Sequence, residues 1–227
     1  MKLIFLNTWH GKIRQELADF IKAESSEDAI FCLQEVGGEA ESLCAEIFTE
    51  HAVAKGSKLF AEGALYQSTY VHNRRAKIVS SEMIADADMD IGAGLYTHIM
   101  AGGTSLHVGN VHGLPQPGDK LDSGARIKQS EKFIEFFKEK DGAKIIGGDF
   151  NVLPETKSIR LFAEHGYRDL IKDFNIVTTR NRLAWKYPVK HYYSDYLFVS
   201  PEVRVTSFSV PQIEISDHLP LILDIEL

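Results

Sequence analysis

The stretch KIIGGDFN, residues 144–151, joins a short apolar run to two glycines and then to an acid and an amide. An apolar run bounded by turn residues is typical of a buried strand. Paired glycines let a backbone turn tightly and approach another molecule closely. The stretch therefore predicts a strand at 144–146 whose end presents Asp149 and Asn151, the first candidate functional residues.

Polar side chains follow or precede several other apolar runs in the same way. Asn7 follows the run at 2–6, and Glu35 follows the run at 29–34. The pair Asp217-His218 stands just before the apolar tail at 221–227. Strand ends are positions from which a rigid sheet can aim side chains into one cleft. We therefore expect these residues to share a site with Asp149.

The remaining pattern alternates helical and strand-like segments. Apolar residues recur at helical spacing in four segments, which are 11–24, 39–50, 122–140 and 156–165. Strand-like runs bounded by glycine and polar clusters cover 64–71, 77–81, 95–100, 105–111, 196–200 and 203–210. Helices interleaved with many antiparallel strands predict two sheets packed face to face with helices outside, a layered α/β sandwich formed as one domain over 1–227.

Composition sets limits on the function. With 44% apolar and 25% charged residues, the 227-residue chain has the make-up of a globular protein. Its net charge of −7 argues against strong non-specific affinity for nucleic acid through the molecule as a whole. Neither a secretion signal nor a membrane-spanning run is evident in the sequence, so we expect a cytoplasmic monomer without a membrane anchor. We expect Cys32 and Cys44 to be buried, unpaired side chains.

Six short motifs occur in one order along nearly the whole chain: LNTW, LQEV, NVHG, GGDFN, YSDYLFVS and SDHLPL. In this order the sequence resembles the endonuclease/exonuclease/phosphatase superfamily. Each motif alone is weak, but the ordered set is a strong joint signal. The resemblance implies a DNase I-like four-layer α/β/β/α sandwich, with two mostly antiparallel sheets flanked by helices, and hydrolysis of phosphoesters that depends on Mg²⁺ or Mn²⁺.

The resemblance also implies a metal site. Glu35 would be the principal ligand, with Asn7 and Asp217 nearby to complete the site or to bind a second ion. Carboxylate and amide oxygens are the hard ligands that Mg²⁺ prefers. For Asn7 a plain turn residue at the end of a strand is an equally good interpretation.

Five catalytic roles follow from the same resemblance. Asp149 and Asn151 would orient or deprotonate the attacking water and bind a phosphate oxygen. His218 would contact the scissile phosphate as a charged donor or an acid/base, with Asp195 fixing its ring. His112 would lie opposite His218, where it could protonate the leaving oxygen or clamp the phosphate.

Other residues are candidates for substrate binding. Arg126 resembles an arginine of the family in the helix after NVHG, although a solvated helix face is the alternative. The segment 174–194 has no acidic residue and mixes cations with aromatic rings, which suits a nucleic-acid backbone with unstacked bases. It would also suit a phosphorylated head group or a solvated loop. Its candidates are Arg180, Arg182, Trp185 and Lys186.

The sequence therefore predicts a metal-dependent phosphodiesterase or nuclease in which water attacks the phosphorus in line. A phospholipid hydrolase of the sphingomyelinase-like branch and a phosphosugar hydrolase are alternatives within the same superfamily. A binding module that kept the fold without catalysis is a third possibility, and it would be expected to lose metal ligands first.

Overall fold

The computed structural model describes residues 1–60, 63–185 and 190–226. One six-stranded sheet consists of β1 (Lys2–Asn7), β2 (Ala29–Gln34), β3 (His51–Phe60), β4 (Gly63–His72), β11 (Arg204–Ser209) and β12 (Leu221–Glu226). The strands lie in the order β11-β12-β1-β2-β4-β3. Only β1 and β2 pair in parallel, and the other neighbours are antiparallel.

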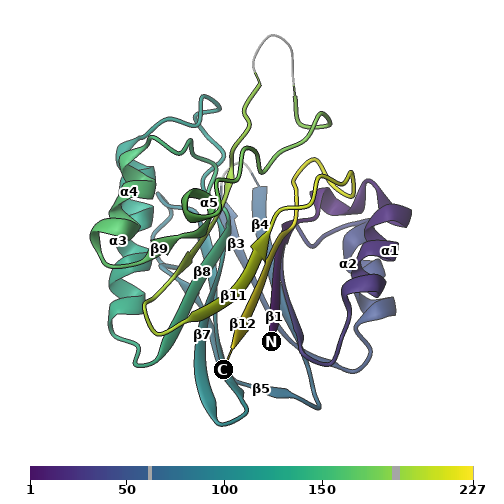
Figure 1. Cartoon of the computed structure of the whole chain (residues 1–227). Coiled ribbons are helices and arrows are strands. Elements are labelled where there is room, and N and C mark those ends of the chain that lie inside the picture. Colours follow the sequence, from purple (N-terminus) through teal and green to yellow (C-terminus); the bar gives the residue numbers. More distant parts are fainter. Residues whose placement is uncertain (61–62, 186–189, 227) are drawn as a thin grey trace.

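The second six-stranded sheet packs against the first (Figure 1). Its strands are β5 (Ala76–Ile84), β6 (Ala93–Ala101), β7 (Thr104–His112), β8 (Ala143–Asp149), β9 (Arg168–Asp169) and β10 (Asp195–Val199). They lie in the order β5-β6-β7-β8-β10-β9, with β7 and β8 parallel. Both sheets are mixed and mostly antiparallel, as predicted.

Helices cover the outer face of each sheet. Figure 1 shows α1 (Arg14–Glu24) and α2 (Glu39–Ile47) beside the first sheet, and α3 (Gly124–Lys138) and α4 (Lys157–Glu164) beside the second. The predicted four-layer α/β/β/α sandwich is therefore confirmed. A short helix, α5 (Leu170–Asp173), follows β9. Among the described residues, no helix has the length and apolar character needed to cross a bilayer.

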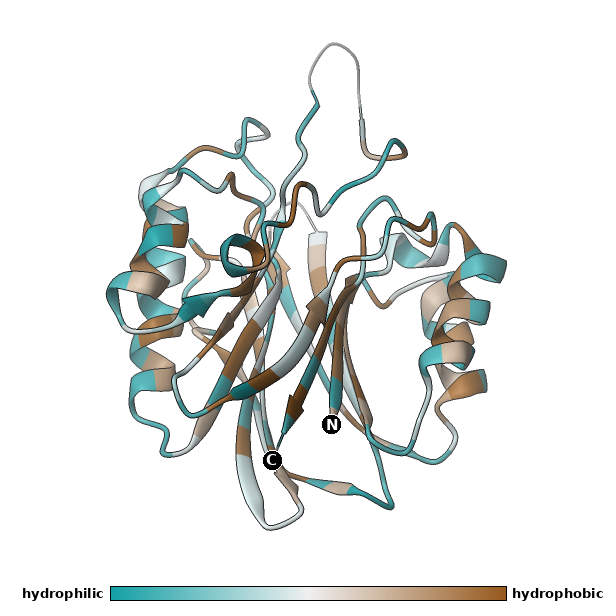
Figure 2. Ribbon diagram, in the orientation of Figure 1, coloured by the Kyte–Doolittle hydropathy of each residue, from teal (hydrophilic) through white to brown (hydrophobic). Residues whose placement is uncertain are grey.

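Alternation along β1 shows how the layers are built. Leu3 and Phe5 point into the core between the two sheets, whereas Ile4 and Leu6 pack into a second apolar cluster under α1 and α2. Successive side chains of a strand face opposite sides, so a strand covered on both faces is apolar throughout. Figure 2 shows this hydrophobic colouring along the central strands. Cys32 and Cys44 are buried and unpaired, as expected.

The two glycines of the KIIGGDFN stretch serve packing between strands. A Cβ on Gly147 would come within 2.3 Å of the Leu197 side chain, and one on Gly148 within 2.3 Å of the Val111 carbonyl oxygen. From their sequence alone, these glycines were expected to form a tight turn that approaches the substrate. The structure corrects this interpretation, because both are strand residues held against neighbouring strands.

The first predicted helix begins later than its pattern suggests. A tight turn, η1 (Trp9–Gly11), precedes α1, and its three residues have φ angles of 50°, 55° and 75°. L-residues rarely adopt this left-handed region, and each costs roughly 1–2 kcal/mol there. Only Thr8 separates this strained turn from Asn7, so the turn connects the end of β1 to the residues around it.

Gly11→Ala should therefore destabilise the fold by about 2–4 kcal/mol, because it adds left-handed strain to a backbone clash. Its Cβ would lie 2.5 Å from the Ala40 backbone nitrogen. The matched control is Gly166→Ala, since Gly166 has φ of +87° but open space around it. Urea unfolding should show a loss of only about 1–2 kcal/mol for the control. Equal losses in the two variants would contradict a role for the close approach to Ala40.

Candidate active site

The ends of two parallel strand pairs bring the sequence-predicted residues to one edge of the sandwich. In the first sheet Asn7 pairs with Gln34, which places Glu35 just beyond the same edge. In the second sheet His112 lies opposite Asp149, and Asp149 lies opposite Asp195. Parallel strands end on the same side of a sheet, so these side chains converge without help from the loops.

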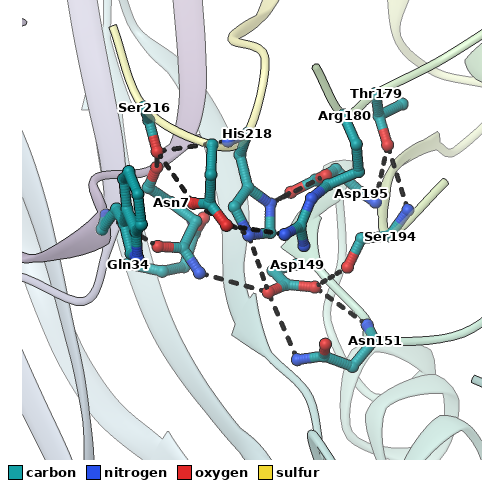
Figure 3. Close-up of polar contacts among 12 residues, drawn as sticks. Asn7, Gln34, Asp149, Asn151, Thr179, Arg180, Ser194, Asp195, Ser216 and His218 are labelled. Atoms are coloured by element: carbon teal, nitrogen blue, oxygen red, sulfur yellow. Dashed lines mark hydrogen bonds and ion pairs between the residues drawn. The ribbon is translucent and has the colours of Figure 1, made fainter. Parts of the chain in front are cut away.

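Asp149 is the centre of the hydrogen-bond network at this edge (Figure 3). Its carboxylate accepts from the side-chain nitrogens of Asn7 and Asn151, each at 3.2 Å, and from the Asn151 backbone nitrogen at 3.0 Å. A fourth hydrogen bond comes from the Ser194 hydroxyl. A carboxylate with four donors is held in one orientation.

His218 lies between two carboxylates. Its Nδ1 is 2.9 Å and 3.0 Å from the two oxygens of Asp195, and its Nε2 is 3.6 Å from Asp149 Oδ2. Because an ionised carboxylate only accepts, Nδ1 carries a proton and donates it to Asp195. Asp195 therefore fixes the ring, and Nε2 is the nitrogen that faces the pocket with Asp149.

Glu35 occupies the opposite wall. Asn7 Nδ2 donates to Glu35 Oε1 at 3.0 Å, while His10 and His112 present their Nε2 atoms at 3.3 Å and 3.6 Å from the carboxylate. The backbone of Glu35 has φ of 54°. Non-glycine residues held in this region cluster at functional sites, since the rest of the fold must offset the strain.

The loop before β12 contributes Asp217, which is paired with an arginine from the 174–194 segment. Arg180 Nη2 donates to Asp217 Oδ2 at 2.7 Å, and each side chain is 12% exposed. Arg180 also lies beside His218 through a backbone bridge. The segment predicted to bind substrate thus places one of its cations next to two of the predicted site residues, Asp217 and His218.

A pocket of about 350 Å³ opens over these residues. Glu35, His112, Asp149, Asn151, Arg180, Asp217 and His218 line it together with Trp9, His10, Lys12 and Tyr66. Asn7 and Asp195 lie behind this lining and orient the residues that do face the pocket. The pocket therefore combines carboxylates, imidazoles and a guanidinium in one cavity, as a site that binds a phosphate with a cation requires.

The sequence model of the Endonuclease/Exonuclease/phosphatase family matches residues 4–218, which includes every residue of this pocket. The chain belongs to this family. Among curated protein sequences no match is found. The family assignment agrees with the resemblance noted from the six sequence motifs, and it makes the chain a member of a group of phosphoesterases and nucleases.

Several solved structures of the family share the fold at low sequence identity. An endonuclease/exonuclease/phosphatase from Bacteroides vulgatus superposes with a TM-score of 0.79 at 18% identity, covering 100% of this chain and 98% of that one. A mannosyl-6-phosphatase from Bacteroides thetaiotaomicron gives 0.73 at 17%, with 100% of both chains covered. The human Nocturnin catalytic domain with bound sulfate gives 0.75 at 17%, covering 100% and 93%.

The charge states of Asp149 and His218 are set by their neighbours. Burial alone would raise the pKa of Asp149, but His218, Lys120, His112 and Arg180 outweigh it and hold that pKa well below its usual range. Burial and Arg180 push the pKa of His218 down, yet Asp195 and Asp149 together raise it above the ordinary value. Asp149 is therefore a carboxylate and His218 favours the imidazolium form.

The pocket also fits a divalent cation. The Glu35 side chain is 23% exposed and faces the pocket, and within the described residues its ion-pair partners are imidazoles rather than a lysine or arginine. Asp217 adds a second carboxylate on the same lining. Asn7 turns its nitrogen toward Glu35, because its oxygen accepts from the Trp9 backbone nitrogen at 3.0 Å. In this arrangement Asn7 supports Glu35 as a hydrogen-bond donor.

One further group of potential metal ligands is better explained as a chain of polar contacts in which His218 lies between Asp195 and Asp149. Asp149, Asp195 and His218 have ligand atoms within 4.8 Å of one another, and all three side chains are buried. His218 Nδ1 is already engaged by Asp195, as the distances above show. Glu35 is therefore the strongest candidate for a metal ligand, and Asp217, which also faces the pocket but is paired with Arg180, is the second.

Four residues predicted to bind substrate lie elsewhere or outside the described residues. Arg126 is fully buried and donates to backbone carbonyls of the 113–123 loop, so we no longer assign it to substrate. Arg182 lies exposed and is paired with Glu214. Trp185 packs against Tyr192 with Lys190 over its ring, and it is absent from the pocket lining. Lys186 lies outside the described residues.

Sequence reasoning missed several residues of the site. Lys120 reaches Asn151 and Ser194 from the loop before α3, where no strand end or motif marks it. Ser194 could have been noticed, because it directly precedes Asp195 in YSDYLFVS. His10, next to LNTW, contacts Glu35 only because the Trp9–Gly11 turn adopts left-handed backbone angles. Local sequence patterns carry little information about such turns.

Proposed function

We propose that this protein is a divalent-metal-dependent phosphodiesterase that cleaves nucleic acid by in-line attack of water on the phosphorus. The observation that supports the proposal most strongly is the single pocket lined by Glu35, Asp149, Asp217, His112 and His218. When bound, a divalent cation supplies positive charge that polarises the phosphoester. Glu35 and Asp217 are the residues that would hold it.

Side chains of the pocket would supply the other parts of the mechanism, which are charge stabilisation and the orientation of water. Arg180 and the His218 imidazolium face the pocket and would stabilise the charge that builds up on the phosphate oxygens. Asp149, with a depressed pKa and four hydrogen-bond donors, is a weak proton acceptor. It is therefore better suited to orienting water and His218 than to deprotonating water.

A nucleic-acid substrate is favoured by the composition of the 174–194 segment. Arg180 lies in the pocket, and Lys190 stacks over Trp185 beside Tyr192 further along the segment. Aromatic rings with adjacent cations bind unstacked bases and a phosphate backbone. Arg182 contributes less to this surface, because Glu214 neutralises it.

A phosphosugar is the second candidate substrate. A second pocket, of about 510 Å³, adjoins the first one and shares His10 and Tyr66 with it. Glu41, Lys55 and Ser57 add polar groups to its lining. Such a lining suits a hydroxyl-rich group attached to the scissile phosphate.

The test is a metal-dependent panel of single- and double-stranded DNA, RNA, a sphingomyelin analogue and a hexose 6-phosphate. We expect turnover of nucleic acid with Mg²⁺ or Mn²⁺, loss of turnover after chelation by EDTA, and recovery when the metal is restored. Faster turnover of the hexose 6-phosphate than of nucleic acid would instead support the phosphosugar as the substrate. Activity that survives complete metal removal would refute metal dependence.

No hydrolysis of any panel member with either metal would favour the non-catalytic binding module instead. Single-domain organisation, a monomeric state and a cytoplasmic location stay predictions. Size-exclusion chromatography with light scattering tests the oligomeric state directly.

A further inference from the structure

Lys120 is a buried cation close to the catalytic group, and no motif or role assigned above accounts for it. Its residue exposure is 9%, and it lies in the 113–123 loop between β7 and α3. The backbone there is unusual, with φ of 59°, and its carbonyl accepts from the Leu153 nitrogen at 2.9 Å. The loop thus holds Lys120 in a left-handed conformation that a lysine does not favour.

A second buried cation shapes the loop that carries Lys120. The fully buried guanidinium of Arg126 donates to the carbonyl oxygens of Leu121 and Pro117, each at 2.6 Å, and to that of Leu114 at 3.2 Å. A planar fork of donors is suited to fixing several acceptors at once. Arg126 therefore fixes the carbonyls on either side of Lys120.

The ammonium of Lys120 determines the orientation of two neighbouring groups. Nζ donates to Asn151 Oδ1 at 2.7 Å and to Ser194 Oγ at 2.8 Å. An ammonium has donors only, so the oxygen of the Asn151 amide must face it. The Asn151 nitrogen is then left to donate to Asp149 and to the Gly113 carbonyl, each at 3.2 Å.

The same logic applies to Ser194. Its oxygen accepts from Lys120, so its own proton is free to donate to Asp149. The Lys120 ammonium is therefore connected to the Asp149 carboxylate by two hydrogen-bonded routes, one through Asn151 and one through Ser194. Burial lowers the pKa of Lys120, while the negative charges of Asp149 and Asp195 oppose that shift. A charge is costly in such a place unless it is compensated, which argues that it has a use there.

We propose that Lys120 is a positioning residue for the catalytic group, acting through Asn151 and Ser194 so that both donate hydrogen bonds to Asp149. The proposal rests on the function proposed above. Lys120 is absent from the pocket lining, so it would not touch substrate. Its removal should loosen Asp149 and Asn151 and slow the chemical step more than substrate binding.

The central experiment compares Lys120→Met with Lys132→Met, the same change at an exposed lysine of α3. We expect kcat for the preferred panel substrate to fall by about 10²-fold in Lys120→Met, as for a small misplacement of catalytic groups, with KM changed by less than about threefold. Lys132→Met should match the wild type. A kcat for Lys120→Met within about threefold of wild type would overturn the proposal.

A double-mutant cycle separates positioning from an independent contribution. If Lys120 acts only through Asn151 and Ser194, then adding Lys120→Met to the double variant Asn151→Ala/Ser194→Ala should cost less than about threefold beyond that double variant alone. Full multiplication of the two losses would overturn the proposed route. Lys120→Gln keeps a neutral donor and should lie between Lys120→Met and wild type. It serves as the second variant if thermal melting shows that Lys120→Met is unfolded.

A measurement that does not depend on enzymatic turnover can test the role of Lys120 separately from the proposed function. In ¹⁵N-labelled protein, the side-chain NH₂ resonances of Asn151, assigned by their loss in Asn151→Ala, should move in Lys120→Met and stay in Lys132→Met. That result in a protein without hydrolytic activity would support the positioning contact and reject the proposed function. Unmoved resonances in a folded Lys120→Met variant would reject the contact itself.

Discussion

Replacing Glu35 with glutamine is expected to lower phosphoester hydrolysis by about 10³-fold or more, since losing several kcal/mol of charge stabilisation costs a factor of ten for each 1.4 kcal/mol. The substitution keeps the shape of the side chain and its contacts with Asn7 and His112, but removes the negative charge. Initial rates with saturating Mg²⁺ and Mn²⁺ measure the loss. Calorimetric titration with Mn²⁺ should show weaker binding in the same variant.

A second substitution at this position separates function from stability. Glu35 has φ of 54°, a conformation that glycine adopts without strain. Glu35→Gly should therefore keep its free energy of unfolding within about 1 kcal/mol of wild type while losing activity as fully as Glu35→Gln. The protein would then hold a strained acid for catalysis rather than for folding. Activity near wild type in either folded variant would remove Glu35 from the metal site and from the proposed mechanism.

Replacing His218 with asparagine is expected to lower kcat by about 10²–10⁴-fold, the range typical for loss of a general acid or base. The imidazole side chain is 4% exposed, hydrogen-bonded to Asp195 and directed toward Asp149. An asparagine offers hydrogen bonds but no proton that moves near neutral pH. Steady-state kinetics on the preferred substrate should show the loss mainly in kcat.

Two further variants show whether the loss of kcat arises from the contact between His218 and Asp195. Asp195→Asn keeps an acceptor for Nδ1 but removes the charge that favours imidazolium, so we expect a smaller loss, about 10²-fold. His98→Asn alters a half-buried histidine of β6 that contacts Ser105, away from the pocket, and should leave kcat unchanged. If His218→Asn kept its kcat within about threefold of wild type while folded, the assignment of His218 to the chemistry would be wrong.

Much of the fold could be predicted because its signals are local. The strands at 64–71, 95–100 and 105–111 correspond to β4, β6 and β7, and the four helices fall within a few residues of their predicted places. The strand β3 was not anticipated. At this sheet edge exposed positions alternate with half-buried or buried ones, and the two buried residues are Ala54 and Lys58 rather than large apolar side chains, so HAVAKGSKLF carries no clear apolar period.

The proposed site was predictable where a motif coincides with a strand end. Asn7, Glu35, Asp149 and His112 each stand at the end of a parallel strand, so the sheets bring them together. The substrate-binding candidates were less predictable, because loop side chains choose partners that are distant in sequence. Arg126 was expected at the substrate and instead donates to loop carbonyls, and Arg182 was expected at a phosphate and instead pairs with Glu214.

Apolar periodicity predicts most of the strands and the four longer helices, and the six ordered motifs indicate the family and mark the acids, amides and imidazoles at the strand ends. Periodicity and short motifs are local signals, because they depend on residues that are close together in the chain. The contacts of Asn7 with Asp149, across 142 residues, and of Lys120 with Ser194, across 74, are established by the folded structure and by no local pattern. The physical reason is that a buried polar group must find a partner wherever packing places one, and packing depends on the whole chain.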